Sequence, residues 1–114
     1  MLRLTVATAA LTLLCMPTIA GTYSIPLPPL EYSGPYRGHV TWHHVSLAKM
    51  QKLCGGYGLK EHVLACALPQ GAHCVIVMPR IGGQITRTIW HRLRIHELGH
   101  CNGWPGDHPN PRWQ

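Results

Sequence analysis

Three patterns that often reveal a function are missing from this chain of 114 residues. No two cysteines form a Cys-x-x-Cys pair, which disfavours a structural zinc site built on cysteines alone. No run of five basic residues and no known nucleic-acid-binding motif occurs, so no specific nucleic acid is expected as a partner. No internal repeat occurs either, and the length predicts one small domain.

No charged residue occurs between Leu4 and Ala20, directly after Arg3. The segment has a short positive start, an apolar run and small residues before a cleavage point near Ala20, which predicts a secretory signal peptide over residues 1–20. A membrane anchor is disfavoured because the uncharged stretch barely reaches the roughly 20 residues of a span and Pro17 interrupts it. A bulky residue before Cys15 argues against a lipoprotein site. We expect a secreted or periplasmic protein with no stable membrane span after cleavage.

The remaining chain of about 94 residues is small, and such a domain buries only about 60 to 65% of its unfolded surface. Covalent cross-links are therefore expected. Outside the signal segment the cysteines are Cys54, Cys66, Cys74 and Cys101. An even count in an exported chain predicts two disulfides, and three pairings are possible. We favour Cys54 with Cys66, and Cys74 with Cys101, which would tie a strand to the end of the last helix.

The charges are sparse but mostly positive: the formal net charge is +6, and removing Arg3 with the signal leaves about +5. Such a balance suits an acidic surface or an acidic substrate, although a soluble basic exported domain is the simplest interpretation.

Residues 21–36 carry four prolines and cannot form a regular helix or a central strand. We expect an extended N-terminal arm, either a flexible tether or, slightly favoured, a segment packed on the domain. The side chains that would pack are Tyr23, Ile25, Leu27 and Leu30.

Residues 37–114 are predicted to form one domain of α+β class, with a small and mostly antiparallel sheet. Ser46 is the expected N-cap of the first helix, and Gly103 is expected to end the last one. In chain order we predict a strand (Arg37–Val45), a helix to Gly55, a strand (His62–Leu68), a turn (Pro69–Gly71), a strand (His73–Pro79) and a helix from Thr86 or Thr88 to Cys101.

The last helix carries the sequence HELGH, residues 96–100. His96 and His100 lie four residues apart, so their imidazoles project from one face, one turn apart, and both can bind one metal ion. Glu97 lies beside this pair, where its carboxylate can accept a proton from an attacking water. Zinc is the expected ion and amide hydrolysis the expected chemistry.

The stretch HELGHCNGWPGDH resembles the zincin metallopeptidases over the last quarter of the chain. The resemblance implies a zinc-dependent peptidase with a peptide or protein substrate, in a minimal zincin fold like that of small exported bacterial and phage-associated proteins. It also implies that Cys74–Met78 is an edge strand beside the active-site helix, where extended substrate binds by strand addition.

The third zinc ligand departs from the family patterns. In the metzincin branch the ligand stands three residues beyond the glycine that matches Gly103, but that position is Gly106. No methionine follows Met78 to form the metzincin methionine turn, and no glutamate follows Glu97 to serve as a gluzincin ligand.

The C-terminal tail is the expected source of the third ligand. A turn through Trp104-Pro105-Gly106 could direct the next residues to the metal. We favour His108 as the ligand, with Asp107 orienting a histidine or serving as the alternative third ligand. A ligand from elsewhere in the chain stays open.

Other groups are less sharply indicated. Tyr57, His73 and Arg80 could each stabilise an oxyanion, but none is distinguished by its spacing. Cys101 points about 100° away from His100 around the helix, so we expect it to be a disulfide partner rather than a ligand.

The leading hypothesis is a small exported zinc metallopeptidase with Glu97 as general base. The alternatives are a secreted, zinc-stabilised binding or structural module without catalysis and a hydrolase of peptidoglycan peptides. A closed site with four protein ligands would favour the structural module, because catalytic zinc keeps one position open. Oligomeric state has no sequence indicator here.

Overall fold

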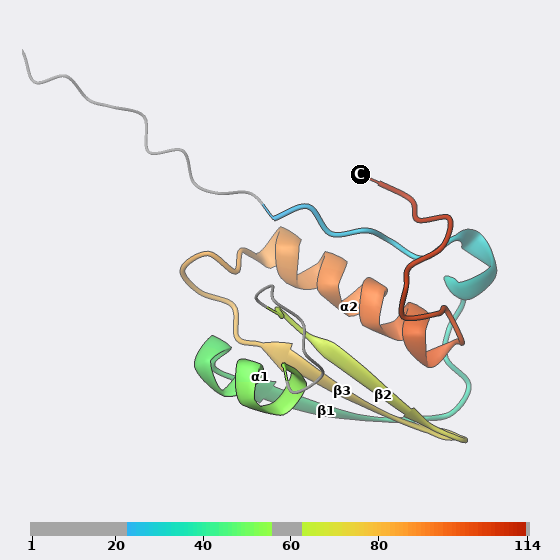
Figure 1. Ribbon diagram of the computed structural model, residues 1–114, viewed down its shortest axis with the longest axis horizontal. Coiled ribbons are helices and arrows are strands. Elements are labelled where there is room, and N and C mark those ends of the chain that lie inside the picture. Colours follow the sequence, from blue (N-terminus) through green and yellow to red (C-terminus); the bar gives the residue numbers. More distant parts are fainter. Residues whose placement is uncertain (1–22, 56–62, 114) are drawn as a thin grey trace, which may run out of the picture.

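A computed structural model describes residues 23–55 and 63–113, and the predicted signal peptide lies outside this part of the chain. The described residues form a small α+β domain in which helices cover both faces of one sheet (Figure 1). The elements are the 3-10 helix η1 (Leu30–Tyr32), strand β1 (His39–Val45), helix α1 (Leu47–Cys54), strands β2 (Cys66–Gln70) and β3 (His73–Pro79), and helix α2 (Arg87–Cys101).

The sheet is mixed, with strand order β1-β3-β2. β3 pairs with β1 in parallel and with β2 antiparallel. The expectation of a mostly antiparallel sheet with Cys74–Met78 at its edge is therefore wrong, because these residues belong to the central strand. The nearly continuous apolar run of β3 has the pattern of a strand buried on both faces.

The edge strand β2 starts and ends later than predicted. It covers Cys66–Gln70 instead of His62–Leu68, and His62 lies outside the described residues. The hairpin turn falls on Gly71 and Ala72, where Gly71 adopts a φ of 65°. Pro69 is compatible with a strand here because β2 is an edge strand.

The two helices pack on opposite faces of β3, as the alternation of side chains along a strand requires. Met50 and Cys54 of α1 form a buried cluster with Val45 and Val77. The other face forms a larger cluster in which α2 packs against β3, through Cys74, Ile76, Met78, Ile89 and Leu93.

The helix boundaries follow local capping. The hydroxyl of Ser46 accepts a hydrogen bond from the Lys49 N–H (3.2 Å), as predicted. Thr86, rather than Thr88, caps α2 by accepting from the Ile89 N–H (3.2 Å). Neither helix in the described ranges is long and apolar enough to cross a membrane.

Both predicted disulfides are confirmed. Cys54 pairs with Cys66, which ties α1 to β2, and Cys74 pairs with Cys101, which ties the central strand to the end of α2. The second bond joins the apolar cluster to the helix turn that carries the HELGH histidines, so that turn is fixed to the sheet.

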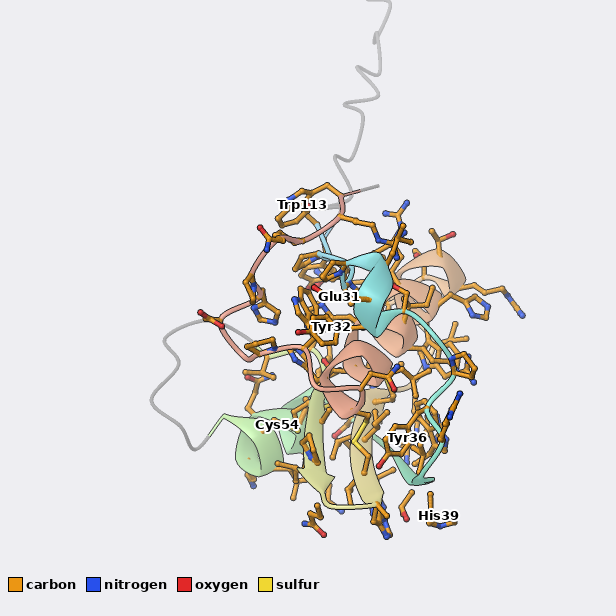
Figure 2. The ribbon with its side chains drawn as sticks, turned by 90° about the vertical axis from the view of Figure 1, so that its right-hand side faces the viewer. Glu31, Tyr32, Tyr36, His39, Cys54 and Trp113 are labelled. Atoms are coloured by element: carbon orange, nitrogen blue, oxygen red, sulfur yellow. A yellow bond between two sulfur atoms is a disulfide. The ribbon has the colours of Figure 1, made fainter. Side chains whose placement is uncertain are left out.

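The N-terminal arm packs along α2 and meets the C-terminal tail there (Figure 1, blue and red). Ile25 and Leu27 are buried, and Tyr23 packs partly buried against the core. Leu30 differs from the prediction, since it is 76% exposed at the start of η1. Figure 2 shows Trp113 of the tail at the same end of the domain as Glu31 and Tyr32, with His39 at the opposite end.

Candidate metal centre

Three imidazoles converge at the C-terminal end of α2. The Nε2 atoms of His96 and His100 lie 3.2 Å apart, as expected for histidines one helical turn apart. The Nε2 of His108, from the tail, lies 3.0 Å from each of them. The three residues form a group that could hold a metal ion, and no fourth His, Cys, Asp or Glu of the described ranges joins it.

A reversal of the chain after α2 starts the approach of the tail. The N–H of Gly103 donates to the His100 carbonyl (3.1 Å) and the N–H of Trp104 donates to the Gly99 carbonyl (2.9 Å). These two bonds make a Schellman motif, in which the residue after the C-cap adopts a positive φ. Gly103 occupies that position with a φ of 101°. The predicted role of Gly103 is confirmed, and the reversal returns Trp104 to the last helical turn.

A second turn brings His108 back to the helix. The His108 N–H donates to the Pro105 carbonyl (3.0 Å), which closes a four-residue turn. His108 itself has a φ of 57°, an uncommon left-handed conformation for a residue other than glycine. Such a conformation costs on the order of 1 kcal/mol and persists only where the surroundings hold it. The position of His108 is therefore determined by its surroundings rather than by local preference.

Backbone carbonyls orient two of the imidazoles. The Nδ1 of His96 donates to the Pro26 carbonyl of the arm (2.5 Å), and the Nδ1 of His100 donates to the Trp104 carbonyl (2.7 Å). A carbonyl only accepts, so Nδ1 carries the hydrogen and the neutral ring has a bare lone pair on Nε2. Two such lone pairs face each other at 3.2 Å. A shared cation satisfies both, and three imidazole nitrogens fit zinc.

Trp104 lies against all three histidines. Its ring stacks on His100 with 4.9 Å between centroids and meets His96 and His108 edge to face at 5.1 and 4.9 Å. The residue is only 2% exposed, and its indole N–H donates to the Pro109 carbonyl (2.9 Å). Trp104 thus forms the apolar support of the centre in a chain with no methionine after Met78.

Glu97 is buried beside the triad, at 4% exposure. Burial raises the pKa of Glu97 to about 8, because a carboxylate is poorly solvated there. Burial also lowers the pKa of His96 to about 4, against a smaller opposing effect of the Pro26 carbonyl. At neutral pH without metal, both groups favour their neutral forms, so the 3.9 Å contact between His96 Nε2 and Glu97 Oε1 is not an ion pair.

Asp107, the alternative third ligand, is exposed and lies outside the group of convergent side chains. Burial and the nearby His100 lower the pKa of His108, and they outweigh the negative charge of Asp107, which raises it. The tertiary structure therefore brings His108, rather than Asp107, to the histidine pair.

A cavity of about 460 Å³ opens beside the three histidines and Glu97. Its other walls are almost entirely apolar and come from the edge strand β2, the segment before it and the nearby disulfide, namely Cys54, Val63, Ala65, Cys66, Ala67, Leu68 and Pro69. Trp104 and Gly106 line it on the tail side. The edge strand beside the site is therefore β2.

The candidate oxyanion donors are not gathered here. His73 pairs with Thr41 of β1 (2.9 Å), and Arg80 is exposed after β3; neither lines the cavity. Tyr57 lies outside the described residues. The other described histidines, His39, His43, His44 and His91, do not join the group either.

Sequence reasoning missed two contributors to the centre. Trp104 was expected only to form a turn, although a large aromatic residue directly after a helix-ending glycine is a signal for packing back on the helix. The contact of the Pro26 carbonyl with His96 could not be predicted from the sequence, because every residue has a backbone carbonyl that can accept a hydrogen bond. Comparisons of this chain with protein-family models, curated proteins and solved structures gave no match.

Proposed function

We propose that this protein is a small exported zinc-dependent peptidase. The observation that carries the proposal is the convergence of three imidazole Nε2 atoms, within 3.2 Å of one another, on the wall of a cavity that also contains Glu97. Three protein ligands leave a position open, as catalytic zinc requires, whereas structural sites use four. The two disulfides support export, because such bonds persist in oxidising compartments.

In this proposal His96, His100 and His108 hold the zinc. The bound ion would polarise the carbonyl of the scissile bond, acidify the attacking water and favour the carboxylate form of Glu97. Glu97 takes the proton from the water at a carboxylate oxygen and delivers it to the leaving amine. The Pro26 and Trp104 carbonyls keep the His96 and His100 rings in the tautomer that presents Nε2.

The substrate in this proposal is an extended peptide with an apolar side chain near the cleaved bond. β2 is an edge strand and lines the cavity with Ala67 and Leu68, so a peptide could add to its free edge and place a side chain in the cavity. No Lys, Arg or Asp lines the cavity among the described residues, which favours an uncharged side chain.

Replacement of Glu97 by Gln tests catalysis separately from metal binding. We expect Glu97→Gln to keep one zinc per chain, measured by elemental analysis, and to lose cleavage of a fluorogenic peptide library by at least about a hundredfold. Glu31→Gln, at an exposed position in η1, is the matched control and should retain activity.

Zinc bound by wild type and variant alike, with no cleavage of peptides by either, would contradict the peptidase proposal and favour a zinc-stabilised binding module. Cleavage of peptidoglycan peptides but not of protein-derived peptides would assign the activity to the bacterial wall, for which a positive net charge is suited.

A further inference from the structure

Arg112 of the tail is hydrogen-bonded to the arm next to the candidate metal centre. Its backbone forms a two-way bridge with Leu27, since each N–H donates to the carbonyl of the other residue at 2.8 Å. Its guanidinium donates from Nε to the Pro28 carbonyl (2.8 Å) and from Nη2 to the Ser33 hydroxyl (2.9 Å). One side chain and its backbone thus hold three positions of the arm.

The arm that Arg112 holds is already fixed to α2. The Pro26 carbonyl accepts from His96, and Pro28 packs so closely on Gly99 that a Cβ there would lie 2.6 Å from it. The arm therefore contacts both the helix that supplies two histidines and the tail that supplies the third. Because the arm is fixed to α2, the bonds of Arg112 to the arm also hold the tail in place relative to α2.

His108 differs from the other two histidines in how it is held. His96 and His100 each have a carbonyl partner at Nδ1, but no hydrogen-bond partner of His108 Nδ1 is found within residues 23–55 and 63–113. Its ring position depends on the backbone of the tail, which is anchored at Trp104, four residues before His108, and at Arg112, four residues after it. The left-handed conformation of His108 needs such anchoring, because it is strained in isolation.

We propose that Arg112 is a positioning residue of the metal centre: by locking the tail to the arm, it holds the His108 imidazole beside His96 and His100. The proposal rests on the metal-binding part of the proposed function. Arginine suits this task because its planar guanidinium donates in two fixed directions at once, whereas a lysine ammonium cannot reproduce that geometry.

The test is a double-mutant cycle on zinc affinity, measured by competition with a chromogenic chelator. Arg112→Ala should weaken zinc binding by roughly 10- to 100-fold, the usual effect of losing a group that orients a ligand. Arg112→Lys should recover only part of the loss. In a His108→Ala background, Arg112→Ala should have no further effect, because the residue acts through His108. Arg80→Ala removes the same charge from an exposed position and should bind zinc normally.

Cobalt substitution gives a spectroscopic readout that a general loss of stability does not move. The visible absorption of the Co²⁺-loaded Arg112→Ala protein should match that of His108→Ala and differ from wild type. An equal loss of zinc affinity from Arg112→Ala with and without His108 would overturn the proposal and assign the effect to His96 or to the fold.

A measurement without metal separates this proposal from the proposed function. In metal-free protein, the His108 ring protons lie near Trp104, with 4.9 Å between ring centroids, so their NMR shifts report its ring current. Arg112→Ala should move the His108 signals toward unstructured values and leave those of His96 in place. Unchanged His108 signals would overturn the positioning role even if zinc binds, and a failure of wild type to bind zinc would overturn only the proposed function.

Discussion

The indole of Trp104 lies parallel to the imidazole of His100, with 4.9 Å between ring centroids and 16° between ring planes. The same residue accepts the His100 Nδ1 hydrogen at its backbone carbonyl. Trp104 thus holds this histidine at its face and at one edge, which leaves only Nε2 free to bind a metal.

Trp104→Leu should therefore damage both the fold and the centre. Loss of most of a buried indole costs about 3 kcal/mol or more in the free energy of unfolding, and the three histidine rings lose their common support. Urea denaturation and zinc titration measure the two effects. Trp113→Leu, at a position 62% exposed, is the control and should change neither by much. Equal behaviour of the two variants would contradict this account of the centre.

Gly99→Ala should push the arm away from α2. A Cβ at this position would lie 2.6 and 2.7 Å from two carbon atoms of the Pro28 ring, which cannot rotate away. We expect a loss of about 1–3 kcal/mol in stability, typical of overpacking, together with weaker zinc binding as the Pro26 carbonyl leaves His96. Thermal melting with and without zinc measures both.

The control for this substitution is Gly34→Ala, where an added Cβ has no neighbour within 4 Å. Wild-type stability in that variant would show that the effect at Gly99 comes from its contact with the arm. A Gly99→Ala protein as stable as wild type would mean that the arm does not pack on α2 in solution.

Glu97 should make the metal-free protein less stable as the pH rises. Its pKa is raised from 4.5 to about 8 in the folded state, so folding favours the protonated form. The stabilising contribution is complete below about pH 4.5 and is lost progressively as the pH increases through 8.

Glu97→Gln cannot ionise and should escape this loss. In the presence of a chelator, the free energy of unfolding of the variant minus that of wild type should increase steadily between pH 5 and 8, as measured by urea titration at several pH values. Glu31→Gln, at an exposed site, should show no such trend. A difference independent of pH would mean that Glu97 is not buried in the metal-free protein.

The Cys74–Cys101 disulfide should stabilise the domain and the candidate metal centre together. It joins residues 27 apart in the sequence, for which chain entropy in the unfolded state predicts about 3.5 kcal/mol. The double variant Cys74→Ala/Cys101→Ala should lose stability on this order and bind zinc less tightly, because the end of α2 is released from β3. The matched pair Cys54→Ala/Cys66→Ala closes a loop of only 12 residues and should lose less stability. Urea denaturation of both double variants measures the loss of stability, and zinc titration measures the loss of affinity.

Features that depend on neighbours in the chain were predictable. The cap at Ser46, the end of α2 before Gly103 and the pairing of His96 with His100 on one helix face all follow from bonds or geometry within a few residues. The start of α2 was narrowed only to Thr86 or Thr88, and the structure selects Thr86. The disulfide pairing was also predicted. Each bond joins two elements that follow one another in the chain, α1 with β2 and β3 with α2.

Strand order was not predictable in the same way. The parallel pairing of β1 with β3 joins residues 34 positions apart, such as His39 with His73, and nothing local specifies it. As a consequence, β3 was predicted to be the edge strand beside the candidate site, although its continuous apolar run could have indicated a central strand.

The candidate metal centre likewise has one part that the local sequence determines and one part that only tertiary contacts determine. The residues HELGH are sufficient to place two imidazoles and a carboxylate on one helix, because helical periodicity is a property of the local backbone. The choice between Asp107 and His108, by contrast, depended on two turns, on the indole of Trp104 and on the bridge between Arg112 and Leu27. The bridge joins the two ends of the described chain, and the indole contact depends on the packing of Trp104 against α2, so only the folded domain brings the third histidine to the other two.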